Sequence, residues 1–301
     1  GIGTKNIAAD ELEKIYGESF YQAVALDNAA SIFNDLATTG AAALSFMLHV
    51  AAYPTEWFTD QRRIKTLIEG TVQACNLAGA SWGGGESPTM RDIIKPGKAL
   101  LSGSATGLII PANKALSEEK LAKGDRIILF ESCGVHTNGI TLLRKEFLRR
   151  LPQGYKTKLS DGTTFGHALM TPSLIYSRLI EELVSQTEIH YAVHITGHGW
   201  RKIMRANKPF IYQIENLPKP QPIFDLIKEY SGSSNKDMYN SYNMGAGFAV
   251  FAPLQSITKV LQIAKKFKIT AINAGVVRNG PRQVVIQPLN IILSGESLQI
   301  R

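Results

Sequence analysis

Tyr239-Asn240-Ser241-Tyr242-Asn243-Met244-Gly245-Ala246-Gly247 leads directly into the apolar stretch Phe248-Ala249-Val250-Phe251. The asparagine at 243 and the glycines at 245 and 247 stand at the mouth of a predicted strand over residues 246–252. Glycine lets the backbone come close to a ligand or to a neighbouring element, because no Cβ interferes. We therefore expect a strand here whose entrance makes a close backbone contact.

Further segments combine glycines or asparagines with polar residues in the same way. They are Gly1-Ile2-Gly3-Thr4-Lys5, Phe33-Asn34-Asp35-Leu36, Gly83-Gly84-Gly85-Glu86, Gly134-Val135-His136-Thr137-Asn138-Gly139 and His194-Ile195-Thr196-Gly197-His198-Gly199. Each of them alone indicates no more than a tight turn. None has the spacing of a Walker A loop, a GxSxG elbow or a Rossmann fingerprint. The information therefore lies in their order along the chain.

Length and composition favour a folded protein of two domains. The chain has 301 residues, of which 44% are hydrophobic, and we expect a boundary near Pro111, with domains over 1–113 and 114–301. Cys75 and Cys133 are the only cysteines, so a disulfide framework is not expected and a cytoplasmic location fits. No run of eighteen apolar residues or signal peptide is visible, so we expect no membrane partner.

The formal charge of +8 and the pI near 9.4 raise the question of nucleic-acid binding. The basic residues follow helical patterns without interleaved aromatic residues, which indicates solvated helix faces instead. We therefore expect no nucleic-acid partner. A basic protein also suits an anionic, phosphorylated small-molecule substrate.

Periodicity predicts the main helices and strands. In the first block, we expect a helix around Ala29–Leu36 that carries Asn34 and Asp35, a helix from a cap at Thr59 or Asp60 to Gly79, and a strand over Ser104–Ile110. In the second block, we expect strands over 126–130, 189–194, 246–252, 271–277 and 283–287. Helices should run over 140–151, after Pro172 and over 257–264. These elements fit an α+β layer with a mostly antiparallel sheet. A strand, a loop and a helix over 126–151 would present backbone N–H groups to a phosphate.

Two histidines are candidate proton carriers. His136 and His194 lie in glycine-bounded turns at strand ends, and imidazole titrates near neutral pH. Surface or packing roles are the expectation for the remaining histidines, His49, His167, His190 and His198. No cysteine or histidine spacing indicates a zinc site.

The order of these segments resembles the AIR synthetase family, the phosphoribosylformylglycinamidine cyclo-ligases of purine biosynthesis. That family reads approximately DGVGTK, VND, GGET, HSNG, AHxTGGG and FNMGxG, and the match covers nearly the whole chain. The resemblance implies a two-domain α/β (α+β) fold whose N-terminal sheet joins a second subunit in a shared barrel, hence a homodimer, with an α/β C-terminal domain. It also implies an ATP- and Mg²⁺-dependent ligase that closes an imidazole ring by forming a C–N bond, with release of ADP and phosphate.

The resemblance carries site residues onto matching positions of this sequence. As catalytic residues it implies His194, His136 and Asp35, and as ligands of Mg²⁺ it implies Asp35 and Glu86. As residues that bind the nucleotide it implies Gly3, Thr4, Lys5, Asp27, Asn34, Gly84, Gly85, Asn138, Gly139, Thr196, Gly197, Gly199, Asn243 and Gly245.

Other positions depart from the family pattern. Leu100 stands where the family has an acidic residue, and Thr89, Leu174 and His198 replace a glutamate, an arginine and a glycine. A leucine cannot coordinate Mg²⁺, and a histidine narrows a glycine turn, so the selectivity for nucleotide or substrate is open. The alternatives are another ATP-using branch of the superfamily, acting on a different amide, thiamine phosphate or selenide, and a non-catalytic homologue that binds a nucleotide.

Overall fold

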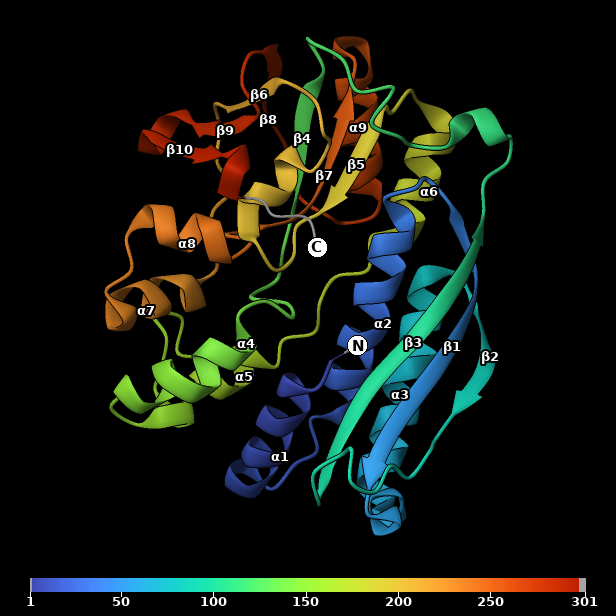
Figure 1. Ribbon diagram of the computed structural model, residues 1–301, viewed down its shortest axis with the longest axis vertical. Coiled ribbons are helices and arrows are strands. Elements are labelled where there is room, and N and C mark those ends of the chain that lie inside the picture. The colour runs from blue at the N-terminus through green and yellow to red at the C-terminus, as the bar shows by residue number, and fades with distance from the viewer. Residues whose placement is uncertain (1, 298–301) are drawn as a thin grey trace.

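Two β-sheets organise the chain, each with helices on its flank (Figure 1). The computed structural model describes residues 2–297. A three-stranded sheet has the order β2-β1-β3, and a seven-stranded sheet has the order β10-β9-β6-β8-β4-β7-β5. The largest buried apolar cluster contains residues from both parts of the chain, for example Phe33 and Leu129. The two parts therefore share a packed interface.

The three-stranded sheet is built from the first part of the chain. Its elements are α1 (Thr4–Tyr16), α2 (Tyr21–Ala37), β1 (Ala42–Tyr53), α3 (Gln61–Ala78), β2 (Ser81–Glu86) and β3 (Lys98–Leu108). The predicted helix ending at Gly79 is confirmed: Asp60 caps it by accepting a hydrogen bond from the Arg63 N–H, and Gly79 ends it in the left-handed conformation. The predicted strand 104–110 starts earlier and ends earlier, because β3 pairs along nearly all of β1.

One face of this sheet is covered by α2 and α3, whereas the other exposes apolar side chains. Those at least one-third exposed on its strands are Leu44, Met47, Trp82, Leu100 and Leu108. β2 pairs in parallel with β1 and forms the outer edge. Leu100, one of the departures from the family pattern, therefore adds to an exposed apolar face.

The seven-stranded sheet is antiparallel except where β6 and β9 pair. Its strands are β4 (Arg126–Glu131), β5 (Tyr191–His194), β6 (Phe210–Ile214), β7 (Ala246–Ala252), β8 (Ala271–Asn279), β9 (Gln283–Ile286) and β10 (Ile291–Ser294). The strand predicted over 246–252 is confirmed, and every residue of it is buried. The mostly antiparallel sheet of the sequence prediction is confirmed as well.

Helices flank this sheet on both sides. α6 (Ser177–Gln186) and α9 (Ile257–Lys266) share one buried cluster with alternate residues of β4 and β7. Further helices of this part are α5 (Phe165–Leu169), α7 (Pro222–Ser231) and α8 (Asn235–Ser241). The predicted helix 140–151 is helical but irregular: α4 (Ile140–Leu142) continues as a π-helical turn to Phe147 and a 3₁₀ turn to Arg150.

The helix predicted after Pro172 begins later than expected, at Ser177. Leu174 precedes it in a segment without regular secondary structure. The physical reason is that side chains of α2 bind this backbone: the Ser173 N–H donates to Asp27 Oδ1 at 2.8 Å, and the Tyr176 N–H donates to Asn34 Oδ1 at 2.8 Å. These hydrogen bonds replace those of an additional helical turn.

Candidate active site

The sheet topology gathers the loops that the sequence singled out. β7 lies between β4 and β5 and runs antiparallel to both, so the ends of β4 and β5 meet the start of β7 at one edge. The loop with His136 follows β4, the turn with His194 ends β5, and Asn243 precedes β7. Segments far apart in the sequence thereby form one site.

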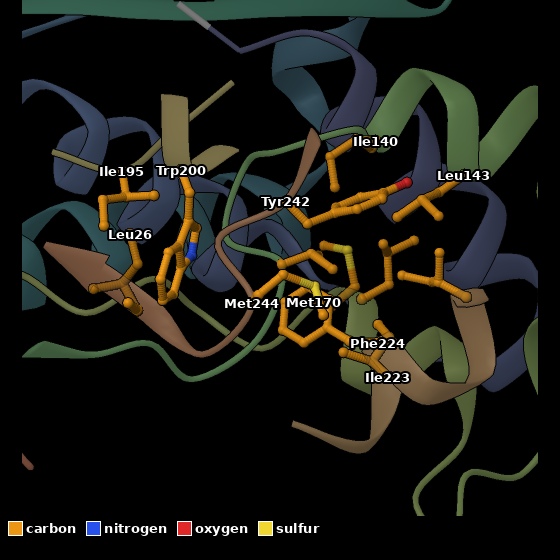
Figure 2. Close-up of a cluster of buried hydrophobic side chains, with 14 of the residues drawn as sticks. Leu26, Ile140, Leu143, Met170, Ile195, Trp200, Ile223, Phe224, Tyr242 and Met244 are labelled. Atoms are coloured by element: carbon orange, nitrogen blue, oxygen red, sulfur yellow. The ribbon is translucent and has the colours of Figure 1, made fainter. Parts of the chain in front are cut away.

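Asn243 ties these loops together. Its side chain is completely buried, accepts a hydrogen bond from Ser132 Oγ at 2.8 Å, and donates from Nδ2 to the Gly134 carbonyl at 2.8 Å. The Trp200 indole donates to the Asn243 carbonyl at 2.7 Å, and Figure 2 shows this indole beside Ile195 in the buried cluster. The amide is thus engaged by protein groups, and its predicted contact with a nucleotide stays a prediction.

The glycines at the mouth of β7 make close contacts with the protein itself. Gly245 has a φ of 91°, and a Cβ there would lie 2.9 Å from the Lys219 carbonyl oxygen. A Cβ on Gly247 would overlap the Tyr176 hydroxyl and would stand 2.7 Å from Cε1 of His136. The expected close backbone approach is confirmed, and its partners are neighbouring elements.

His194 and Asp35 form a hydrogen-bonded pair between β5 and α2. Nδ1 of His194 lies 2.8 Å from Oδ1 of Asp35, and His194 stacks on Phe248. Partial burial raises the pKa of Asp35, but the hydrogen bond with His194 and the charges of His194, Lys202 and Arg205 outweigh it and hold this pKa below its usual value. Because the ionised carboxylate only accepts, Nδ1 of His194 donates the hydrogen. In the neutral form of an imidazole whose Nδ1 carries the hydrogen, Nε2 has a lone pair.

His136 is buried and neutral. Burial, and then the charges of His194 and Lys5, lower the pKa of His136 to about 3. The Cys133 N–H donates to its Nε2 at 3.4 Å, so Nδ1 carries the hydrogen, and within residues 2–297 this buried Nδ1 has no hydrogen-bond partner. The expectation that His136 titrates near neutral pH is therefore wrong, because the turn lies inside the protein. It can act there as a neutral hydrogen-bond donor.

Lys5 and Asp27 form a buried ion pair. Nζ of Lys5 also donates to the His136 carbonyl at 3.1 Å, and Asp27 accepts from the Ser173 hydroxyl at 2.5 Å. Buried charges need such partners, because leaving water is costly. The pair joins α1, α2 and the segment before α6. Asn34 also joins α2 to the segment before α6, since it donates to the Leu174 carbonyl at 2.8 Å.

A cleft of about 210 Å³ lies where α1 and the helical stretch after Gly139 both begin. It is lined by Ile2, Gly3, Thr4, Lys5, Thr137, Gly139, Ile140 and Thr141. The hydroxyls of Thr4 and Thr141 are 3.0 Å apart across it. Free N–H groups and the positive dipole end at a helix N-terminus favour phosphate. The structure thus brings together predicted residues from two motifs. Asn138 lies beside Gly139 but is buried.

The predicted residues on β2 lie elsewhere. Gly84, Gly85 and Glu86 are exposed on the edge strand, where Gly85 pairs with Leu48 and a Cβ on Gly85 would overlap the Leu48 carbonyl. Figure 1 shows β2 on the far side of β1 and β3 from the strand β5 that carries His194. Glu86 and Asp35 therefore do not form one metal site within the chain. Residues 2–297 also contain no cluster of three or more carboxylate, histidine or cysteine side chains suited to a metal ion.

The turn after β5 lies at the site. The Gly199 N–H donates to the Thr196 carbonyl at 2.9 Å, and Gly199 has a φ of 52°. Gly197 and His198 are exposed at its tip. This geometry leaves Thr196 and Gly197 open to a ligand, whereas a Cβ on Gly199 would overlap the carbonyl of Tyr239.

Sequence reasoning missed three residues of the site. Tyr176 is completely buried against Gly247 and donates to the Glu131 carbonyl at 2.6 Å, and Lys202 and Arg205 stand near Asp35. Tyr176 gave no signal beyond an apolar pattern. Lys202 and Arg205 lie in the basic stretch after the glycine turn, which is a usable signal for an anion site.

Comparison with known proteins identifies the family. The profile of AIR synthase related protein, N-terminal domain, matches residues 12–109, and that of AIR synthase related protein, C-terminal domain, matches residues 122–287. The chain belongs to the AIR synthase related protein family.

Relatives and solved structures agree with this placement. The phosphoribosylformylglycinamidine cyclo-ligase of Methanocaldococcus jannaschii is 32% identical over 275 residues, which cover 90% of this chain and 74% of that protein. The crystal structure of hydrogenase maturation protein HypE in complex with ATP matches with a TM-score of 0.67 at 17% identity, covering 92% of this chain and 80% of the other. Thiamine-monophosphate kinase from Stenotrophomonas maltophilia K279a matches with a TM-score of 0.64 at 16% identity, covering 90% and 80%. These structures share the fold. Within residues 2–297, no helix has the length and apolar character needed to span a bilayer.

Proposed function

We propose that the protein is an ATP-dependent cyclo-ligase that closes the imidazole ring of aminoimidazole ribonucleotide from phosphoribosylformylglycinamidine. The observation that carries the proposal is that predicted residues from separate motifs lie next to one another. Gly3, Thr4 and Lys5 line the cleft, and Lys5 binds the His136 carbonyl. His136 in turn lies near His194, which is hydrogen-bonded to Asp35. The named activity of relatives such as the Methanocaldococcus jannaschii enzyme supports it.

The cleft and the histidines suit different parts of this reaction. ATP supplies a phosphoryl group that activates the formyl oxygen, and the helix N-termini at Thr4 and Ile140 suit its phosphates. A C–N bond then forms as the amidine nitrogen attacks the formyl carbon, and the C–O bond breaks with release of phosphate. Nε2 of His194 accepts the proton that this nitrogen loses, whereas the catalytic role of His136 stays a prediction, because its Nδ1–H is buried.

Mg²⁺ fits this site through one carboxylate of the chain. Mg²⁺ is usually bound by one or two carboxylates together with phosphate oxygens and water, so a protein cage is not required. Asp35 is ionised and its side chain is 68% exposed, which suits this role. Glu86 has no such neighbour within the chain, and its predicted role as a ligand stays a prediction.

A homodimer built on the three-stranded sheet is part of the proposal. Its exposed apolar face, with Leu44, Met47 and Leu108, would be covered by the same face of a second copy. The division into domains at 113 and 114 and a cytoplasmic location likewise stay predictions.

The test is phosphate release from ATP that depends on phosphoribosylformylglycinamidine. We expect His194→Ala to abolish it while the far-ultraviolet circular dichroism remains that of the wild type. His167→Gln is the matched control, because His167 lies on α5 and contacts Glu18 and Tyr16, which are not residues of the candidate site. Unchanged turnover in folded His194→Ala would remove His194 from the mechanism. Release of phosphate only with another phosphate-bearing or amide substrate would reassign the reaction.

A further inference from the structure

The 3₁₀ helix η6 (Gly199–Met204) begins immediately after the site turn and is rigidly anchored. Trp200, Ile203 and Met204 are completely buried, and Figure 2 shows Trp200 packed with Leu26 and Ile195. The Trp200 indole also donates to the Asn243 carbonyl. With these positions facing the core, the basic side chains of the helix are held on its other side.

Arg201, the first of these basic residues, supports the structure. Its Nε donates to the His198 carbonyl at 3.2 Å and its Nη2 to the Asn240 carbonyl at 3.2 Å. These hydrogen bonds join η6 to α8. Arg201 is therefore occupied by protein groups.

Lys202 and Arg205 are different, because within residues 2–297 neither side chain has an ion pair or a hydrogen bond. They are three residues apart, and Arg205 follows η6 directly in a right-handed helical conformation, so the two side chains emerge from the same side of the turn. Lys202 is half-buried and Arg205 is exposed. Burial and then the charge of Arg205 lower the pKa of Lys202. Two like charges thus stand together without an anionic partner that binds either directly.

The carboxylates nearby are already engaged. The charges of both cations help to lower the pKa of Asp35, but Oδ1 of Asp35 lies 2.8 Å from Nδ1 of His194 and binds it. Glu118 and Arg205 both lie near Tyr191, and Glu118 accepts a hydrogen bond from the Asn207 N–H at 2.9 Å. Both carboxylates keep their charge, but neither binds Lys202 or Arg205 directly, so the ammonium and guanidinium groups are left for an anionic ligand.

We propose that Lys202 and Arg205 bind the phosphate of a phosphate monoester substrate. This inference rests on the proposed function, because it assigns the non-reacting end of the substrate of that same site. Arginine offers a planar fork to phosphate oxygens and lysine a point charge, so together they balance a dianion. The pair stands near Asp35, whereas the cleft of Thr4 and Thr141 has a separate lining, so we assign the two phosphate-bearing molecules to separate places.

The test is calorimetric titration of ribose 5-phosphate, with unphosphorylated ribose as a second probe, in the presence of a saturating non-hydrolysable ATP analogue. We expect Lys202→Met and Arg205→Met each to weaken ribose 5-phosphate about tenfold, the change that 1.4 kcal/mol corresponds to, since hydrogen bonds to charged groups have this size. Affinity for the ATP analogue should stay unchanged. Lys259→Met is the charge-matched control, because Lys259 is exposed on α9. Thr141→Val should weaken the analogue alone.

Each contrary outcome has a defined meaning. Equal losses in Lys202→Met and Lys259→Met would show a general charge effect and overturn the proposal. So would ribose 5-phosphate binding that neither variant alters, no binding of it to the wild type, or equal binding of ribose. Cyclisation by the wild type with the substrate KM unchanged in both variants would overturn this inference alone. Binding that depends on Lys202 without any cyclisation would overturn the proposed function and leave the inference standing.

Discussion

Replacement of Gly247 by alanine should destabilise the protein, because the added methyl group has no space. The new Cβ would overlap the hydroxyl oxygen of Tyr176 and would lie 3.1 Å from its Cζ and 2.7 Å from Cε1 of His136. Tyr176 is completely buried and His136 is 2% exposed. Neither ring can move into solvent, so the strain falls on the packed interior.

The magnitude follows from what Tyr176 must give up. Its hydroxyl donates to the Glu131 carbonyl at 2.6 Å, and a displaced ring would leave buried polar groups unpaired. An unpaired buried polar group costs about 1–3 kcal/mol, and overpacking a core costs about 1–3 kcal/mol. The same displacement of the Tyr176 ring determines both costs, so they do not add fully. We expect the free energy of unfolding to fall by about 2–5 kcal/mol.

Urea unfolding followed by tryptophan fluorescence measures this change. Gly197→Ala is the matched control, because a Cβ there meets no atom within 4 Å. Tyr176→Phe/Gly247→Ala should be less destabilised than the sum of its single variants, since the clashing hydroxyl is gone. A loss below about 1 kcal/mol in Gly247→Ala, with an unchanged slope of free energy against urea, would refute the reasoning.

Three further predictions follow from the same geometry. The pKa of His136 lies at about 3 in the folded protein against 6.5 for an unperturbed histidine, so its contribution to stability is complete above pH 6.5 and is lost as the pH falls towards 3. Between these pH values, His136 should contribute about 1.4 kcal/mol per pH unit to the slope of the free energy of unfolding against pH. Urea titrations at several pH values should show that His136→Gln lowers this slope by that amount, and equal slopes in variant and wild type would contradict the assignment. Asp35→Asn should weaken Mg²⁺-dependent ATP binding clearly while the melting temperature changes little. Calorimetry that finds the same Mg²⁺ dependence of ATP binding in the wild type and the variant would exclude Asp35 as a ligand. The protein should be a dimer by light scattering at micromolar concentration, and Leu44→Glu should convert it to monomers; a monomer mass for the wild type would rule out the shared barrel.

The elements that were predicted correctly carry their signals within a few residues. α3 has a capping aspartate at its start, a regular apolar stripe and a glycine at its end, each of which acts locally. The residues around the start of β7 likewise predict both the strand and its close backbone contact. Such features are readable because a cap, a turn and a periodic face are each decided by adjacent residues.

The elements that were missed depend on partners distant in the chain. β2 contains Gly83, Gly84 and Gly85, which favour no strand, and it becomes one by pairing with β1. The start of α6 is delayed to Ser177 because Asp27 and Asn34 bind the preceding backbone. No pattern within either segment contains this information.

The same distinction holds for the site. The identity and order of its motifs, and with them the family and the position of polar loops at strand ends, are contained in the sequence. The tertiary structure alone decided that His136 is neutral, that Lys5 is buried against Asp27, and that Glu86 lies apart from Asp35. The reason is physical: protonation, burial and charge pairing depend on the groups that surround a side chain in space. Some of these groups are distant in the chain, as in the contact of Lys5 with the His136 carbonyl, 131 residues away, and that of Asp35 with His194, 159 residues away.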